Sequence, residues 1–272
     1  MKNINFAQTF KPEKQYISSL LKITLINEVM TAKEVSLATG IPMGERSGKV
    51  IPHIEYSKYM GLLDYEKIDG NTFKLSLTSL GNIVLEEDPG LKEELTLVLL
   101  HSMLTRNGAG APLWGVMFQT VFPKYHGSII VEDAIKELNL IYDNKVTRKN
   151  FSPFLNSYED LFAPLDFINF KDEQIKLSYS QKIDKDFLYL YAFILFSYWD
   201  ELYPNRIEIT AEEFASLKYG IRLNMDSQTE YAVLDFLNEK GLIRVNRQLS
   251  PYTILKSSAK DELIKKLYSE LF

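Results

Sequence analysis

Residues 31–63, TAKEVSLATGIPMGERSGKVIPHIEYSKYMGLL, recur in altered form as residues 210–243, TAEEFASLKYGIRLNMDSQTEYAVLDFLNEKGLI, and this pair decides the fold. Both copies begin with Thr-Ala-x-Glu, the pattern of a capping box. In that motif the threonine hydroxyl and the glutamate carboxylate each accept a backbone N–H from the other end of the first helical turn. We therefore expect Thr31 and Thr210 each to open a helix.

Glycines close the matching segments of each copy. Gly40 and Gly220 follow the first helix, and Gly61 and Gly241 follow the second, with the same number of residues between the glycines of each pair. Glycine just past a helix adopts the left-handed conformation that ends it at little cost. The sequence thus predicts two short helices per copy. We place the start of the second helix of the first copy at Pro52, since proline suits the first helical position.

Each second glycine leads into a segment with the pattern of two strands. Residues 62–77, LLDYEKIDGNTFKLSL, alternate around Asp-Gly-Asn, a favourable hairpin turn. The counterpart, residues 242–256, turns at Ser-Pro. An amphipathic helix over residues 16–25 precedes the first copy. Helices, a turn and a hairpin in this order are the arrangement of a winged helix.

A fainter third copy lies between these two. Residues 131–140 and 147–158 are predicted to be helical, and residues 165–179, LDFINFKDEQIKLSY, again have the pattern of a hairpin. The predicted fold class is mainly α with small β-hairpins, an α+β fold of tandem winged-helix-like units. We divide the chain into an N-terminal winged helix, a central winged-helix-like unit and a C-terminal winged helix, at residues 1–88, 89–183 and 184–272.

Composition narrows the function classes. The 272 residues are 46% hydrophobic and 25% charged, which is enough apolar surface for packed cores. The absence of cysteine excludes disulfides and thiolate metal sites, and fits a cytoplasmic location. The histidines His53, His101 and His126 lie far apart, without metal-ligand spacing. The sequence predicts neither a metal nor another cofactor.

The most apolar stretch is residues 187–199, FLYLYAFILFSYW. It is shorter than the roughly 20 residues that a membrane span needs, and acidic residues flank it on both sides. We expect a buried helix between units and no membrane contact. His101 lies in a second apolar segment, residues 95–104, where a hydrogen-bonded core histidine is the expected role.

The candidate DNA-binding surface lies in the N-terminal unit, before and along its second helix and on its hairpin. Its cationic and polar members are Arg46, Ser47, Lys49, His53, Lys58, Lys67 and Lys74. Free N–H groups at a helix N-terminus favour phosphate, and modules of this shape insert this helix into the major groove. Val50, Ile54 and Met60 should form its buried side. The alternative is a packing helix with solvated polar residues.

No catalytic residue is predicted, and the protein is not expected to be an enzyme. Residues 44–49, GERSGK, approach a P-loop, but the spacing between the glycines is one residue short and no hydroxyl follows the lysine. Asp166, Glu173 and Lys176 on the central hairpin lack the usual nuclease spacing.

The C-terminal copy is poorly suited to DNA. Its second helix carries four acidic side chains and a single lysine at its end, and phosphate would be repelled there; the acids are Asp226, Glu230, Asp235 and Glu239. This unit is better suited to packing, dimerisation or a protein partner. The net charge of −5 also counts mildly against nucleic acid.

Several short motifs together resemble a bacterial family, domain of unknown function 4007. They are FAQTFKPEKQYISSLL at 6–21, Gly61-Leu62-Leu63, LTSLG at 77–81 with Asp88-Pro89, the helix at 95–104 with Trp114, and FLNSY at 154–158. The resemblance implies an accessory protein of a DNA-modification system (phosphorothioation) or of antiviral phage defence, because members are encoded beside such genes. It brings no catalytic residues. The loop 42–47 is longer than the family's usual glycine-lysine turn.

The leading hypothesis is a non-enzymatic DNA-binding accessory protein of such a system. Its partners would be double-stranded DNA and protein components of the complex. A protein–protein adaptor without direct DNA contact is the second hypothesis. The third is a transcription regulator, for which a homodimer and a palindromic operator are expected.

Overall fold

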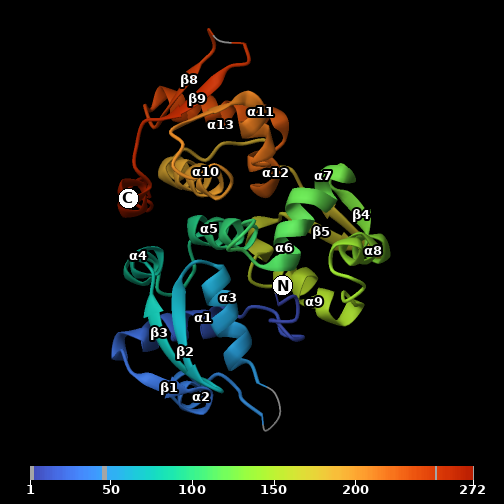
Figure 1. Cartoon of the computed structure of the whole chain (residues 1–272), viewed down its shortest axis with the longest axis vertical. Coiled ribbons are helices and arrows are strands. Elements are labelled where there is room, and N and C mark those ends of the chain that lie inside the picture. Colours follow the sequence, from blue (N-terminus) through green and yellow to red (C-terminus); the bar gives the residue numbers. More distant parts are fainter. Residues whose placement is uncertain (1–2, 45–47, 249, 272) are drawn as a thin grey trace.

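The computed structural model describes residues 3–44, 48–248 and 250–271, and its elements follow the three predicted units (Figure 1). The N-terminal unit contains α1 (Lys14–Ile23), η1 (Thr24–Ile26), β1 (Val29–Thr31), α2 (Ala32–Thr39), α3 (Val50–Tyr59), β2 (Leu63–Asp69), β3 (Thr72–Leu77) and α4 (Ser79–Glu87).

The central unit contains α5 (Glu94–Leu104), α6 (Pro112–Val116), η2 (Met117–Val121), α7 (Phe122–Lys124), β4 (Ser128–Ile130), α8 (Val131–Ile141), α9 (Arg148–Glu159), η3 (Ala163–Leu165), β5 (Ile168–Lys171) and β6 (Gln174–Leu177). The C-terminal unit contains η4 (Lys185–Phe187), α10 (Leu188–Leu202), β7 (Glu208–Thr210), α11 (Ala211–Ser216), α12 (Tyr219–Arg222), α13 (Ser227–Glu239), β8 (Ile243–Asn246), β9 (Thr253–Lys256) and α14 (Lys260–Lys265).

Each unit has one small antiparallel sheet of three strands. A short strand before the helices pairs with the second strand of the hairpin, which gives the orders β1-β3-β2, β4-β6-β5 and β7-β9-β8. The outer copies also agree in register, since Thr31 lies opposite Thr72 and Thr210 lies opposite Thr253. The predicted α+β class with small β-hairpins is confirmed, and the central hairpin has the topology of the other two.

The local signals at the helix starts are confirmed in atomic detail. Glu34 Oε2 accepts the Thr31 N–H at 2.7 Å, while the Glu34 N–H donates to Thr31 Oγ1 at 3.3 Å. The second box has the same contacts at 2.8 and 3.3 Å, between Thr210 and Glu213. Gly40 ends α2 with a left-handed φ of 72°, the C-cap that its position predicts.

The predicted role of Gly220 is wrong. Helix α11 stops at Ser216, Lys218 takes the left-handed conformation with a φ of 53°, and Gly220 lies inside α12. A Cβ at Gly220 would lie only 2.9 Å from the carboxyl carbon of Glu230. The glycine is therefore required by a close approach of α13, and not by a helix end.

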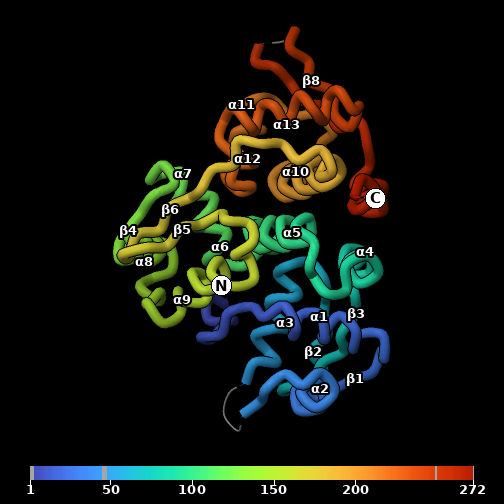
Figure 2. Tube along the Cα trace, turned by 180° about the vertical axis from the view of Figure 1, so that it is seen from behind, coloured from blue at the N-terminus to red at the C-terminus, as the bar shows by residue number. Residues whose placement is uncertain are grey.

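Helix α5 lies at the centre of the molecule, between the other two units (Figures 1 and 2). Every residue from Leu95 to Leu104 is buried, and a helix that is apolar on all sides must be enclosed by protein. It is contacted by α3 of the N-terminal unit, η3 of the central unit and α10 of the C-terminal unit. One apolar cluster consequently runs through all three units.

Two predictions about buried elements are confirmed. Helix α10 contains the apolar stretch and is buried along most of its length. Within the described residues, no helix combines the length and apolarity that crossing a membrane requires. His101 is a satisfied core histidine, because its Nε2–H donates to the Arg222 carbonyl at 2.8 Å and its Nδ1 accepts the Tyr158 hydroxyl at 3.0 Å. The ring thereby joins α5 to both later units.

A first test concerns Gly81, in the first turn of α4. A Cβ there would lie 1.8 Å from the Leu62 carbonyl oxygen, and backbone atoms cannot yield as a side chain does. We expect Gly81→Ala to lower the free energy of unfolding by about 3 kcal/mol or more. Gly108→Ala is the control, since a Cβ at Gly108 meets nothing within 4 Å. Urea unfolding that gave both variants the same stability would contradict this packing.

Candidate nucleic-acid interface and inter-unit cleft

Helix α3, the predicted groove-reading helix, is enclosed. It begins at Val50 and not at Pro52, and none of its ten residues is exposed. Val50, Ile54 and Met60 are buried, as predicted. The remaining sides are also covered, which the sequence does not indicate.

The N-terminal arm, residues 3–13, covers the other side of α3. The Tyr56 hydroxyl donates to the Phe10 carbonyl at 2.9 Å. The Glu13 N–H donates to His53 Nε2 at 3.0 Å. These contacts attach the arm along the helix face that would otherwise be open.

The same arm is attached to the central unit. Asn150 Nδ2 donates to Asn5 Oδ1 at 2.7 Å, and Lys11 forms an ion pair with Asp160. Helix α3 therefore presents no face to a DNA groove in this structure. Its assignment as the groove-reading helix is overturned, because the arm and the central unit occupy the space that DNA would need.

His53 is a structural residue, which corrects its assignment as a DNA contact. Its side chain is 0% exposed, and both ring nitrogens are used within the protein. Nε2 accepts from Glu13, so Nδ1 carries the proton and donates to the Lys49 carbonyl at 2.7 Å. Burial lowers the pKa of the imidazole to about 4, which keeps the ring neutral near pH 7.

The next two predicted contacts are partly occupied by neighbouring carboxylates. Lys49 forms an ion pair with Glu13 at 2.5 Å, and this hydrogen bond raises the pKa of the lysine. Lys58 lies 3.9 Å from Asp64. Both amino groups therefore have partners within the protein, and neither offers an unpaired charge to a phosphate.

The predicted lysines of the hairpin are the most accessible. Lys67 on β2 and Lys74 on β3 are exposed, and neither forms an ion pair with any residue that the structure describes. The alternation of side chains places them on opposite faces of the sheet, with Lys74 opposite Glu66. Arg46 and Ser47 lie outside the described residues.

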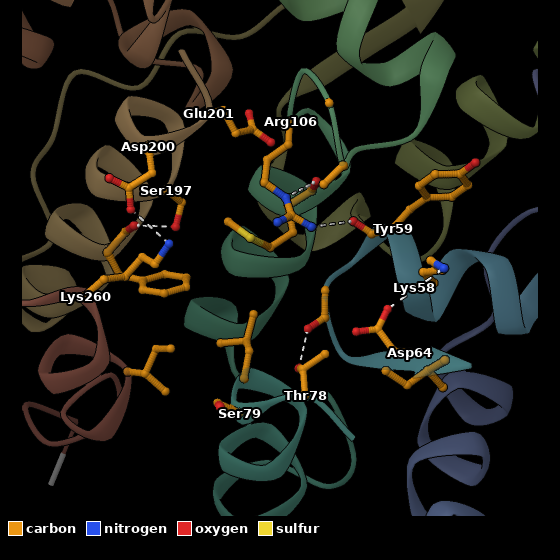
Figure 3. Close-up of a pocket in the computed structure, with 18 residues that line it drawn as sticks. Lys58, Tyr59, Asp64, Thr78, Ser79, Arg106, Ser197, Asp200, Glu201 and Lys260 are labelled. Atoms are coloured by element: carbon orange, nitrogen blue, oxygen red, sulfur yellow. Dashed lines mark hydrogen bonds and ion pairs between the residues drawn. The ribbon is translucent and has the colours of Figure 1, made fainter. Parts of the chain in front are cut away.

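A cavity of about 610 Å³ lies between the N-terminal and C-terminal units (Figure 3). One wall comes from the corner between α3 and β2 and from the start of α4, and the other from α10 and α14. The loop after α5 forms the floor. Polar side chains line the cavity from all sides: Lys58, Tyr59, Asp64, Thr78, Ser79, Arg106, Ser197, Asp200, Glu201 and Lys260.

Arg106 lies on the floor of this cleft. Its Nε donates to the Met103 carbonyl at 3.1 Å, and its Nη2 reaches the Tyr59 carbonyl at 3.5 Å. A Cβ at Gly61 would lie 3.3 Å from Nη2, so the glycine leaves room for the guanidinium. Burial lowers the pKa of Arg106, and the arginine forms no ion pair with a carboxylate in the described part of the chain.

The opposite wall carries two carboxylates in different settings. Asp200 pairs with Lys256 and, at 3.0 Å, with Lys260. Glu201 Oε2 accepts the Asn107 N–H at 2.9 Å, while its Oε1 is buried without a hydrogen-bond partner among the described groups. Sequence reasoning missed this cleft, because its lining comes from three units and forms no local motif.

The fold and these surfaces define a three-unit α+β protein with outward hairpins and a polar cleft at the seam between its first and last units. No family model and no curated protein sequence matches the chain. Two crystal structures of SspB share the fold over the whole chain and 88% of their own. The magnesium ion-bound form gives a TM-score of 0.73 at 14% identity, and the other gives 0.74 at 15%. At these identities the likeness concerns the fold.

The two buried histidines predict a pH dependence of stability. Burial lowers the pKa of His53 to about 4 and that of His101 to about 3, both from an ordinary 6.5. Below pH 6.5 the unfolded chain therefore binds protons that the folded chain does not. The stabilisation is complete above that pH and is lost as pH falls. Between pH 7 and 5 we expect a loss of roughly 2 kcal/mol per histidine, measurable by urea unfolding.

The variant His53→Gln tests the assignment. Its amide can still accept from Glu13 and donate to the Lys49 carbonyl, but it does not titrate. About half of the difference between the two pH values should disappear. A difference as large as in the original protein would show that His53 is not the source.

Proposed function

We propose that this chain is a non-enzymatic accessory protein of a bacterial DNA-modification or phage-defence system, and that it contacts the backbone of double-stranded DNA. The motif resemblance supports the kind of system, and the fold shared with SspB is compatible with it. The observation that carries the DNA contact is the pair of exposed, unpaired lysines on the N-terminal hairpin, Lys67 and Lys74.

The proposed contact is to phosphate and not to bases. With α3 covered, the N-terminal unit acts as a winged helix that uses its hairpin alone. Lysines that meet phosphates add affinity without selecting sequence. The net charge of −5 keeps such binding weak at moderate salt.

A protein scaffold is the second candidate. Helix α13 stands where α3 stands in the first copy, and it retains an exposed face on which Tyr231 is 53% accessible. That face carries Glu239 as well, so it suits a protein partner better than phosphate. The covered α3 supports this candidate too, because it removes direct reading of DNA.

The proposal includes no metal. One of the two SspB structures holds magnesium. In the described part of this chain, no three His, Asp or Glu side chains are close enough together to hold a metal ion. The residues present therefore do not fit a magnesium site of that kind.

DNA contact is tested by fluorescence anisotropy on a random duplex at low salt. Two phosphate contacts predict a slope of about −2 in a plot of log affinity against log salt concentration. The double variant K67E/K74E should bind at least about tenfold more weakly, because two attractions become repulsions. The matched control is K171E/K176E, the same change on two exposed lysines of the central hairpin.

Each outcome separates the candidates. Equal weakening by both double variants would mean that the N-terminal hairpin is not the contact. No binding of duplex by the unaltered chain would favour the scaffold. Retained binding in K67E/K74E with loss in the control would move the surface to the central unit.

A further inference from the structure

We propose that the cleft between the N-terminal and C-terminal units binds a nucleotide, with Arg106 holding its phosphate. The hairpin lysines of the DNA proposal lie outside this cleft, so the two proposals stand or fall separately. The argument rests on a buried arginine, on the polar groups around it and on the apolar remainder of the lining.

Arg106 lacks a close anion. Its printed acceptors are backbone carbonyls, at Met103 and Tyr59. The nearby carboxylates act on it only from a distance, because Asp64 pairs with Lys58 and Glu201 accepts the Asn107 N–H.

A buried charge without a hydrogen-bonded counter-charge is costly, and a bound anion would remove that cost. The planar fork of a guanidinium matches two phosphate oxygens at once. The cleft leaves space in front of Arg106 for such a group, since the arginine lines the cavity and is drawn at its floor (Figure 3).

Further donors face the cleft from both walls. Ser79 begins α4 on the N-terminal wall, where Thr78 caps the Gly81 N–H at 2.9 Å. On the C-terminal wall Lys256 and Lys260 share the single carboxylate of Asp200, which leaves one positive charge over. A phosphate in the cleft would therefore meet donors from both units.

The rest of the cleft suits the rest of a nucleotide. Glu201 Oε1 is a buried acceptor without a partner, so it can take a hydroxyl or amine proton from the ligand. Apolar side chains supply the remaining surface for a base: Leu63, Leu80, Met103, Phe193 and Ile264. The volume of about 610 Å³ lies within the roughly 300–1,000 Å³ of small-molecule sites.

Calorimetric titration of the full chain with AMP, adenosine and inorganic phosphate tests the site. We expect AMP to bind with saturation, and adenosine to bind at least tenfold more weakly because it lacks the phosphate. Arg106→Gln should weaken AMP at least tenfold. Arg148→Gln is the matched control, since Arg148 is exposed and paired with Glu173 on the central unit; it should bind AMP like the unaltered chain.

Several results would overturn the site. They are no AMP binding at millimolar concentration, equal binding of AMP and adenosine, or undiminished binding in Arg106→Gln. If that variant does not fold, Lys260→Gln on the rim decides the matter: it should weaken AMP several-fold, and unchanged affinity rejects the site. The K67E/K74E protein should keep full AMP affinity, which distinguishes this test from that of DNA contact.

Discussion

The structure depends on the enclosure of one helix. Helix α5 has no polar face to leave in water, so elements from all three units close around it. His101 is tolerated there because both of its ring nitrogens find partners, at Arg222 and Tyr158. The same enclosure brings the first and last units together beyond the end of α5, and Arg106 lies at that seam. The cleft is thus a consequence of how the central helix is buried.

Local signals in the sequence predicted the elements well, because the interactions that set them are local. The boxes at Thr31 and Thr210 each involve hydrogen bonds within four residues, and the hairpins follow from alternation and turn residues. Gly220 shows the limit of this approach. A glycine at the expected spacing can end a helix or admit a neighbouring side chain, and only the distant Glu230 decides which.

The candidate site could be predicted only in part. Exposure of Lys67 and Lys74 follows from their place on a hairpin. The covering of His53 does not, because it depends on an arm forty residues away in the chain that packs between two units. Arg106 and Lys260 belong to elements far apart in sequence, and nothing in the local pattern of either indicates that they face one cleft. Burial by remote segments is the physical reason for these failures.

The three units share a topology but cannot share a function, because the surfaces that each leaves exposed are different. Helices α3 and α9 are buried along most of their length, whereas α13 keeps an exposed and acidic face. The hairpins, in contrast, all point away from α5 toward the outside of the molecule (Figure 1). A repeat that packs its second helices inward can use only its hairpins and its seams for partners. That constraint, and not the resemblance of each unit to a winged helix, determines where contacts can form.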